Sequence, residues 1–121
     1  MDLTMVIADD EPIVLKSLEV FVKKEFPEVS VLGTAKNGIE LKELLESFDP
    51  DMAIVDIRMP GLSGIEVIEL LRDRGLKTRY IINTAFSDFE YAKKALDLKT
   101  DGYLLKPGKR EEKREVIGRL I

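Results

Sequence analysis

Short aliphatic, β-branched runs alternate along the chain with longer segments whose apolar residues recur at helical spacing. The strand-like runs are 4–8, 29–33, 52–55, 80–83 and 103–106. The runs 4–8, 52–55 and 80–83 are apolar with little alternation, as in central parallel strands that are covered on both faces. The run 29–33 alternates more, which favours an edge position. The pattern therefore predicts a strand followed by a helix, repeated five times.

Three of the segments between the strands carry apolar stripes that we expect to face the sheet. The stripes are Ile13, Val14, Leu18, Phe21 and Val22, then Leu41, Leu44, Leu45 and Phe48, then Ile65, Ile68 and Leu71. Helix starts are predicted at Pro12, and at Ser63 and Ser87, which each stand three residues before a Glu. Because parallel strands need right-handed helical crossovers, the expected fold is an α/β, flavodoxin-like doubly wound (βα)5 sandwich. Its parallel sheet is expected to have the order 2-1-3-4-5.

Composition narrows the class of protein. A chain of 121 residues, 45% hydrophobic and 35% charged, suits one compact domain, 1–121. The absence of cysteine and histidine excludes thiolate chemistry and the commonest general base. A net charge of −4 argues against a large surface for nucleic acid. No apolar stretch is long enough to span a bilayer, so we expect a cytoplasmic protein.

Polar residues stand where the predicted strands end. They are Asp9 and Asp10 after 4–8, Asp56 after 52–55, Thr84 after 80–83 and Lys106 at the end of 103–106. Ligands of doubly wound sheets bind at the carboxyl ends of the strands, so we expect these side chains to converge on one rim. Each has an ordinary alternative: acids before a helix complement its dipole, an Asp before Pro-Gly forms a turn, and a Lys is solvated. The combination is more specific than any member.

The chemistry of this set points to phosphoryl transfer. Three neighbouring carboxylates repel one another unless a cation neutralises them. Oxygen ligands without His or Cys favour a hard cation, Mg²⁺ before Ca²⁺. On this rim the ammonium of Lys106 would balance a carboxylate or a phosphate, and the hydroxyl of Thr84 can donate to a phosphoryl oxygen. A metal, a carboxylate nucleophile, a lysine and a hydroxyl are what aspartyl phosphorylation requires.

Over essentially its whole length the sequence resembles the receiver domain of bacterial response regulators. The resemblance rests on Asp9-Asp10-Glu11, the stretch 56–64, Thr84-Ala85 and Tyr103-Leu104-Leu105-Lys106-Pro107, in the family's order and spacing. It implies that Asp56 is the phosphoacceptor, that Asp10, Asp9, Asp56 and the backbone carbonyl of Arg58 bind Mg²⁺, and that Lys106 pairs with the phosphate. A domain of this kind is not an enzyme beyond catalysing its own phosphorylation and dephosphorylation.

The resemblance also implies a switch and a set of partners. Thr84 and Tyr103 match the family's switch pair, in which the hydroxyl moves to the phosphate and the ring follows inward. The face made by the fourth helix, fifth strand and fifth helix then changes. Residues 86–96 resemble receivers joined to AraC-type DNA-binding domains, so 1–121 would be the N-terminal part of a longer transcription regulator. The implied partners are a sensor histidine kinase, that C-terminal domain and a second copy in a phosphorylation-dependent homodimer.

Two positions depart from the family pattern. Lys99 stands where many relatives have a Gly after the fourth helix, and a left-handed cap there would cost roughly 1 kcal/mol. Gly108 follows the Lys-Pro pair where a bulkier apolar residue is common, which predicts a looser entry to the last helix. Both departures bear on the output face rather than on the chemistry.

Three alternative functions remain to be weighed against a phosphorylated receiver. A haloacid-dehalogenase-like phosphatase also uses a strand-end Asp nucleophile with Mg²⁺, but it needs a second Asp two positions later, where this chain has Arg58. A flavodoxin-like redox module needs a phosphate loop after the first strand, and none is present. A degenerate receiver that signals without phosphorylation would lack site residues, whereas all five are present here.

Overall fold

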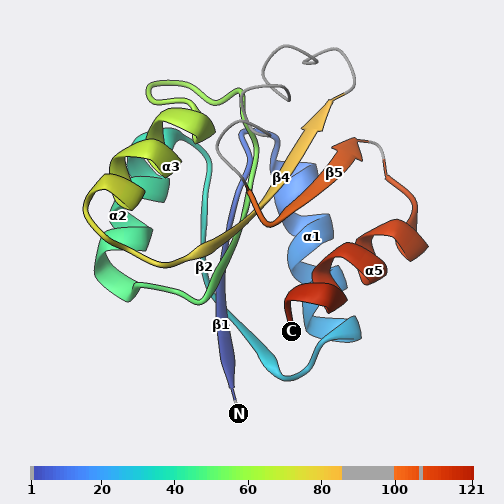
Figure 1. Cartoon of the computed structure of the whole chain (residues 1–121). Coiled ribbons are helices and arrows are strands. Elements are labelled where there is room, and N and C mark those ends of the chain that lie inside the picture. The colour runs from blue at the N-terminus through green and yellow to red at the C-terminus, as the bar shows by residue number, and fades with distance from the viewer. Residues whose placement is uncertain (1, 86–99, 107) are drawn as a thin grey trace.

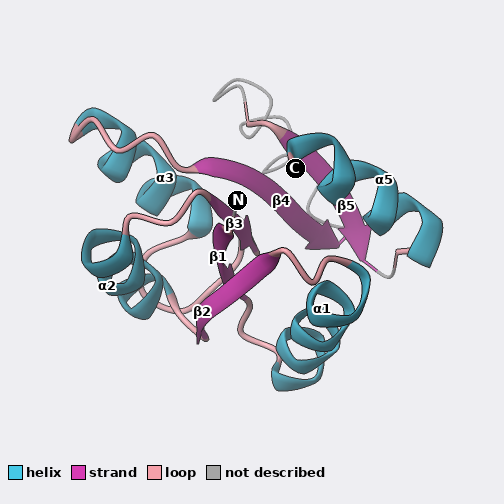
Figure 2. Ribbon diagram, turned by 90° about the horizontal axis from the view of Figure 1, so that it is seen from below, coloured by secondary structure: helices cyan, strands magenta, loops and turns pink. Residues whose placement is uncertain are grey.

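The computed structural model describes residues 2–85, 100–106 and 108–121. Its strands are β1 (Leu3–Ala8), β2 (Val29–Ala35), β3 (Met52–Val55), β4 (Arg79–Ala85) and β5 (Gly102–Lys106). Its helices are α1 (Pro12–Glu25), α2 (Gly38–Phe48), α3 (Gly64–Asp73) and α5 (Arg110–Leu120). The strands form one parallel sheet in the order β2-β1-β3-β4-β5 (Figure 2). The predicted flavodoxin-like fold and strand order are confirmed, and β2 lies at an edge. The helix predicted between the fourth and fifth strands lies outside the described residues.

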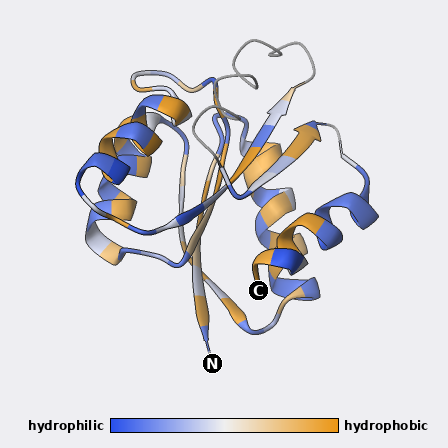
Figure 3. Cartoon of the chain, viewed as in Figure 1, coloured by the Kyte–Doolittle hydropathy of each residue, from blue (hydrophilic) through white to orange (hydrophobic). Residues whose placement is uncertain are grey.

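The sheet separates two apolar cores. Helices α2 and α3 cover one face, and α1 and α5 cover the other (Figure 1). Successive residues of β1 enter opposite cores: Met5 and Ile7 pack toward α1 and α5, while Val6 and Ala8 pack toward α2 and α3. Burial on both faces explains why β1 and β3 are largely apolar, whereas β4 carries polar residues at its start and toward its end (Figure 3).

The predicted helical stripes face the sheet except at their ends. Leu18, Val22 and Leu45 are buried, but Ile13 is 84% exposed and Phe48 is 49% exposed, so the prediction that they face the sheet is wrong. Ile13 lies in the first turn of α1 and Phe48 is the last residue of α2. Periodicity assigns a residue to a face of its helix but does not tell where the covered surface stops. None of the helices in the described ranges is long and apolar enough to cross a membrane.

The start of α3 is determined by local chemistry. Ser63 accepts a hydrogen bond from the Glu66 amide at 3.2 Å, and the Glu66 carboxylate accepts one from the Ser63 amide at 3.2 Å. This capping box satisfies two donors that a helix start would otherwise leave unpaired, as predicted. Pro12 occupies the first turn of α1, also as predicted. The predicted start at Ser87 lies outside the described residues.

Gly64 lets α3 begin directly against β3. A Cβ atom at this position would lie 2.3 Å from the carbonyl oxygen of Asp56 and 2.6 Å from Cγ1 of Val55. We therefore expect Gly64→Ala to destabilise the domain by about 1–3 kcal/mol, because backbone must move to relieve the clash. Urea unfolding measures the change. Gly118→Ala is the matched control, since its Cβ would meet only Phe26 at 3.8 Å and it should gain about 0.5–1 kcal/mol. Equal effects of the two changes would contradict the prediction.

Candidate functional site

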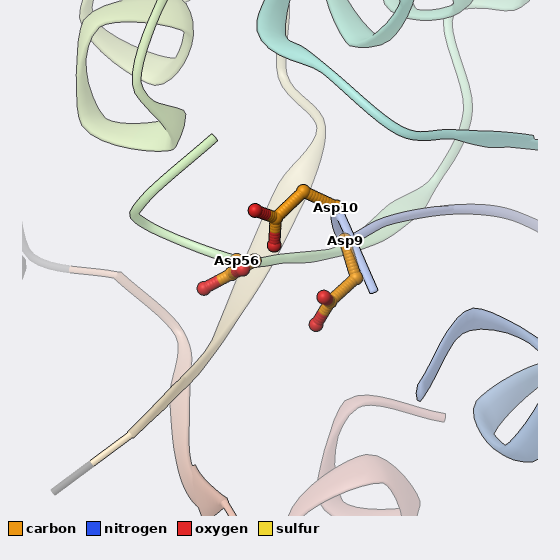
Figure 4. A group of neighbouring side chains, drawn as sticks. All are labelled: Asp9, Asp10 and Asp56. Atoms are coloured by element: carbon orange, nitrogen blue, oxygen red, sulfur yellow. The ribbon is translucent and has the colours of Figure 1, made fainter. Parts of the chain in front are cut away.

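Three carboxylates meet where β1 and β3 end. Asp9 and Asp10 follow β1, and Asp56 follows β3. The two strands are neighbours with Ala8 paired to Val55, so the residues just beyond them are adjacent. One carboxylate oxygen from each aspartate lies within 4.8 Å of the other two (Figure 4). The predicted convergence of Asp9, Asp10 and Asp56 is thus present in the structure.

Backbone hydrogen bonds hold two of these aspartates in place. The amide of Asp9 donates to the carbonyl of Ala35 at 3.0 Å, and the amide of Asp56 donates to the carbonyl of Ala8 at 2.9 Å. These bonds continue the β-sheet ladders past the last strand residues and bring both side chains under the rim. Asp9 is 0% exposed and Asp56 is 3% exposed. Asp10 is exposed, so it forms the outer side of the cluster.

Lys106, the last residue of β5, reaches across to the cluster. Its Nζ lies 2.8 Å from Oδ2 of Asp9 and 3.3 Å from Oδ2 of Asp56. A further carboxylate oxygen, Oε1 of Glu11, lies 3.9 Å away. One ammonium therefore faces several carboxylates, and negative charge stays in excess.

The electrostatics of the site follow from burial and this charge imbalance. Burial and, after it, the Asp9 carboxylate raise the pKa of Asp56, while the ammonium of Lys106 acts in the opposite direction; the net result is a pKa of about 7. Burial disfavours the charged form of Lys106, but the hydrogen bond to Asp9 and the charges of Asp56 and Asp9 outweigh it and raise the pKa of the ammonium. A hard cation bound by the three carboxylates would complete the neutralisation, and their oxygen atoms are the ligands such ions prefer.

Thr84 and Tyr103 lie on the same face of the sheet. Thr84 is fully buried, and its Oγ1 has no hydrogen-bond partner among the described residues. Its neighbour two positions earlier, Ile82, belongs to the core beneath α2 and α3, and strand alternation puts Thr84 on that face. Tyr103 packs against the same core and is paired with Ile82. A buried hydroxyl without a partner is costly, so it suits a group that finds its acceptor in another state. The movement of the pair stays a prediction.

The Arg58 side chain lies next to the acidic cluster. It is exposed, and it lines a surface hollow together with Asp10, Gly61 and Ser63. Gly61 has a φ of +80°, a conformation that favours glycine and turns the chain from β3 toward α3. Arg58 and Asp10 therefore line the same surface hollow. Ligation of a metal by the Arg58 carbonyl stays a prediction.

Sequence reasoning gave no role to two residues of the site. Glu11 contributes a third carboxylate near Lys106, after Asp9 and Asp56, and Gly64 lies against the Asp56 carbonyl. Glu11 directly follows Asp9 and Asp10, so its place in this acidic run could have predicted that it lies near the site. The contact of Gly64 had no signal beyond its place at a helix start, because the clash arises only when β3 and α3 are packed.

The fold and the site define a flavodoxin-like α/β domain with an acidic pocket and a lysine at the carboxyl ends of its strands. Residues 5–118 match the family model of the response regulator receiver domain. The chain therefore belongs to the response regulator receiver domains of two-component systems, which are typically phosphoacceptors and not themselves enzymes.

Named relatives agree with this assignment. The nitrate/nitrite response regulator protein NarL of Escherichia coli K12 is 35% identical over 103 residues, which are 85% of this chain and 47% of NarL. A DNA-binding response regulator of the LuxR family from Staphylococcus aureus has 30% identity and a TM-score of 0.89, with 98% of each chain covered. The REC domain of AraT, a response regulator from Geobacillus stearothermophilus, has 30% identity and a TM-score of 0.91, with 99% of this chain and 93% of that chain covered. The matches span 28% to 50% of the length of the curated relatives.

Proposed function

We propose that this domain accepts a phosphoryl group on Asp56 in a Mg²⁺-dependent reaction and thereby controls a DNA-binding output. The observation that carries the proposal is the buried Asp56 carboxylate, 3.3 Å from Lys106 and grouped with Asp9 and Asp10. A turn-forming aspartate would need neither the burial nor the lysine. Asp9 shares the burial and the lysine contact, so the choice of Asp56 as the acceptor rests on its place at the end of β3, which matches the phosphoacceptor position of the receiver family.

The side chains have distinct roles in this proposal. Asp10, Asp9, Asp56 and the Arg58 carbonyl would hold Mg²⁺, which supplies positive charge for the phosphoryl oxygens. An oxygen of Asp56 attacks phosphorus in line as the bond between phosphorus and the donor's leaving group breaks. Lys106 exchanges its contact with the Asp56 carboxylate for one with a phosphoryl oxygen, while its contact with Asp9 holds the ammonium in place. The unpaired hydroxyl of Thr84 donates to another phosphoryl oxygen, and Tyr103 follows it.

A haloacid-dehalogenase-like phosphatase is the weaker alternative. Such an enzyme needs an acid or base two residues after the nucleophile. In this chain that position is Arg58, whose guanidinium does not release a proton near neutral pH and so cannot act as a general acid or base. The side chain is also exposed beside the cluster rather than buried in it.

The donor of the phosphoryl group is proposed to be a cognate sensor histidine kinase, and the receiver is proposed to work in the cytoplasm as the N-terminal part of a longer regulator. A DNA-binding effector is supported by the relative described as a DNA-binding response regulator of the LuxR family. Residues 86–96, which favoured an AraC-type effector, lie outside the described residues. We therefore propose a DNA-binding effector domain. The LuxR-type description of that relative weighs against the AraC-type prediction. We also propose that phosphorylation favours a homodimer.

Phosphoryl uptake by the wild-type chain tests the proposed function. We expect acetyl phosphate with Mg²⁺ to add one phosphoryl group to the intact protein, as measured by mass spectrometry, and we expect EDTA to prevent the addition. The adduct should hydrolyse rapidly in alkali, since acyl phosphates are labile there. No adduct under these conditions, or equal uptake with EDTA, would contradict the proposal.

A further inference from the structure

The N-terminal half of α5 has no apolar side chain to bury. Residues 110–115 read Arg-Glu-Glu-Lys-Arg-Glu, and the apolar residues of the helix begin at Val116. Lys109, the N-cap residue, makes no side-chain capping hydrogen bond. Helices in proteins are stabilised mainly by packing of an apolar face, so residues 109–115, here called the arm, lack the usual support.

Charge holds the arm against α1. Glu25, the last residue of α1, accepts hydrogen bonds from Arg110 and from Arg114, the latter at 3.3 Å. The Glu25 side chain is only 14% exposed, and the Arg110 hydrogen bond lowers its pKa, as expected for a carboxylate that serves two guanidinium groups. Lys113 Nζ lies 5.4 Å from the ring centroid of Phe21. All of these contacts depend on charge.

The rest of α5 is held in a different way. Ile117 is fully buried and Leu120 is almost fully buried in the core that α1 shares with the sheet. The guanidinium of Arg79, at the start of β4, donates to the carbonyl oxygen of Leu120 at 2.9 Å. Apolar burial does not weaken when salt screens charges, whereas the contacts of the arm do. The two halves of α5 are therefore expected to respond differently to salt.

A pocket that is open to solvent borders the arm at Lys113. It has a volume of about 360 Å³ and is lined by Val14 and Leu18 of α1, by Ala85 and Lys106 at the strand ends, and by Gly108 and Lys113. Gly108 has no side chain to fill this space, and a larger residue would not fit without a shift, because its Cβ would lie 2.7 Å from the Leu105 carbonyl oxygen. Lys113 of the arm thus borders a hollow on one side.

We propose that residues 109–115 form a lid that opens locally away from α1 while residues 116–120 stay packed, and that Glu25 sets how often it opens. Opening moves Lys113 away from the pocket beside Lys106. Local opening of a segment with few buried contacts is expected to occur far below the cost of global unfolding. The inference concerns the α1 and α5 layer and does not depend on phosphorylation of Asp56.

Amide hydrogen exchange of the metal-free chain, resolved by NMR, tests the lid. Screening lengths fall from about 10 Å in 0.1 M salt to about 3 Å in 1 M salt. We expect the Arg114 and Glu115 amides of the wild type to exchange about fivefold faster at the higher salt concentration, while exchange at Ile117 and Leu120 is unchanged. In Glu25→Gln the faster exchange should already be present at low salt, and its salt dependence should be much smaller, because of the contacts with α1 described above only that between Lys113 and Phe21 remains.

A second carboxylate on α1 provides the matched control. Glu19 pairs with Lys23 of the same helix at 3.3 Å. Removing this charge should therefore leave the contacts between Glu25 and the arm intact, and the arm of Glu19→Gln should exchange like that of the wild type. The proposal is overturned if Glu25→Gln leaves exchange at Arg114 and Glu115 unchanged. It is also overturned if exchange at Ile117 and Leu120 rises by the same factor, because α5 would then open as one unit.

Discussion

Asp56→Asn is expected to abolish phosphoryl uptake from acetyl phosphate in the presence of Mg²⁺. The substitution keeps the size of the side chain but replaces the nucleophilic carboxylate oxygen with an amide, whose oxygen is a poor nucleophile at phosphorus. It also removes one of the three carboxylates that are grouped within 4.8 Å, so the charge available to bind Mg²⁺ falls as well. Intact-mass spectrometry after a fixed incubation should show the phosphoryl adduct on the wild type and none on the variant.

The control for this experiment is an aspartate outside the cluster. Asp73, the last residue of α3, is exposed, and Asp73→Asn should take up the phosphoryl group like the wild type. An adduct of equal size on Asp56→Asn would show that another residue is the acceptor. Asp9 and Asp10 would then be the first candidates, because their carboxylates share the same pocket.

The same substitution is expected to stabilise the metal-free domain, increasingly so as pH rises. Burial and the Asp9 charge raise the pKa of Asp56 from 3.8 in a model carboxyl to about 7. Between these values the folded state binds a proton that the unfolded state has lost, so the free energy of unfolding of the wild type falls as pH rises. The loss starts near pH 4 and levels off above pH 7. Asparagine cannot ionise and does not lose this stability.

Chemical denaturation in EDTA at several pH values measures this difference. We expect the advantage of Asp56→Asn over the wild type to be small near pH 4 and to reach roughly 2–4 kcal/mol above pH 7. Mg²⁺ should reduce the advantage, because an ion that binds only the folded wild type stabilises it by mass action. A variant that is less stable than the wild type at pH 8 without metal would contradict the raised pKa of Asp56.

Sequence pattern predicted the elements that depend on local chemistry. The apolar runs of β1, β3 and β4, the capping box of Ser63 and the first-turn Pro12 were all found where they were expected. Those features depend on residues within a few positions of one another, so the linear sequence contains the information. The convergence of Asp9, Asp10 and Asp56 also followed, because the rules for parallel sheets place successive strand ends on one edge.

The balance of contacts inside the site was not predictable. Lys106 lies 97 positions from Asp9, yet its hydrogen bond to Asp9, at 2.8 Å, is shorter than its contact with Asp56, at 3.3 Å. The exposure of Ile13 and Phe48 also differed from the prediction. In each case the outcome depends on how far one layer of the fold extends over another, which is a property of packing and not of periodicity.

By itself, the sequence determined the fold class, the strand order and the set of residues at the strand ends, because hydrophobic period and connection rules act along the chain. Only the tertiary structure decided that Asp9 is buried while Asp10 is exposed, that Gly64 must lie against Asp56, and that Glu25 holds the first half of α5. These features arise from contacts between residues far apart in the sequence. Burial then determines how strongly each charged group interacts with its neighbours.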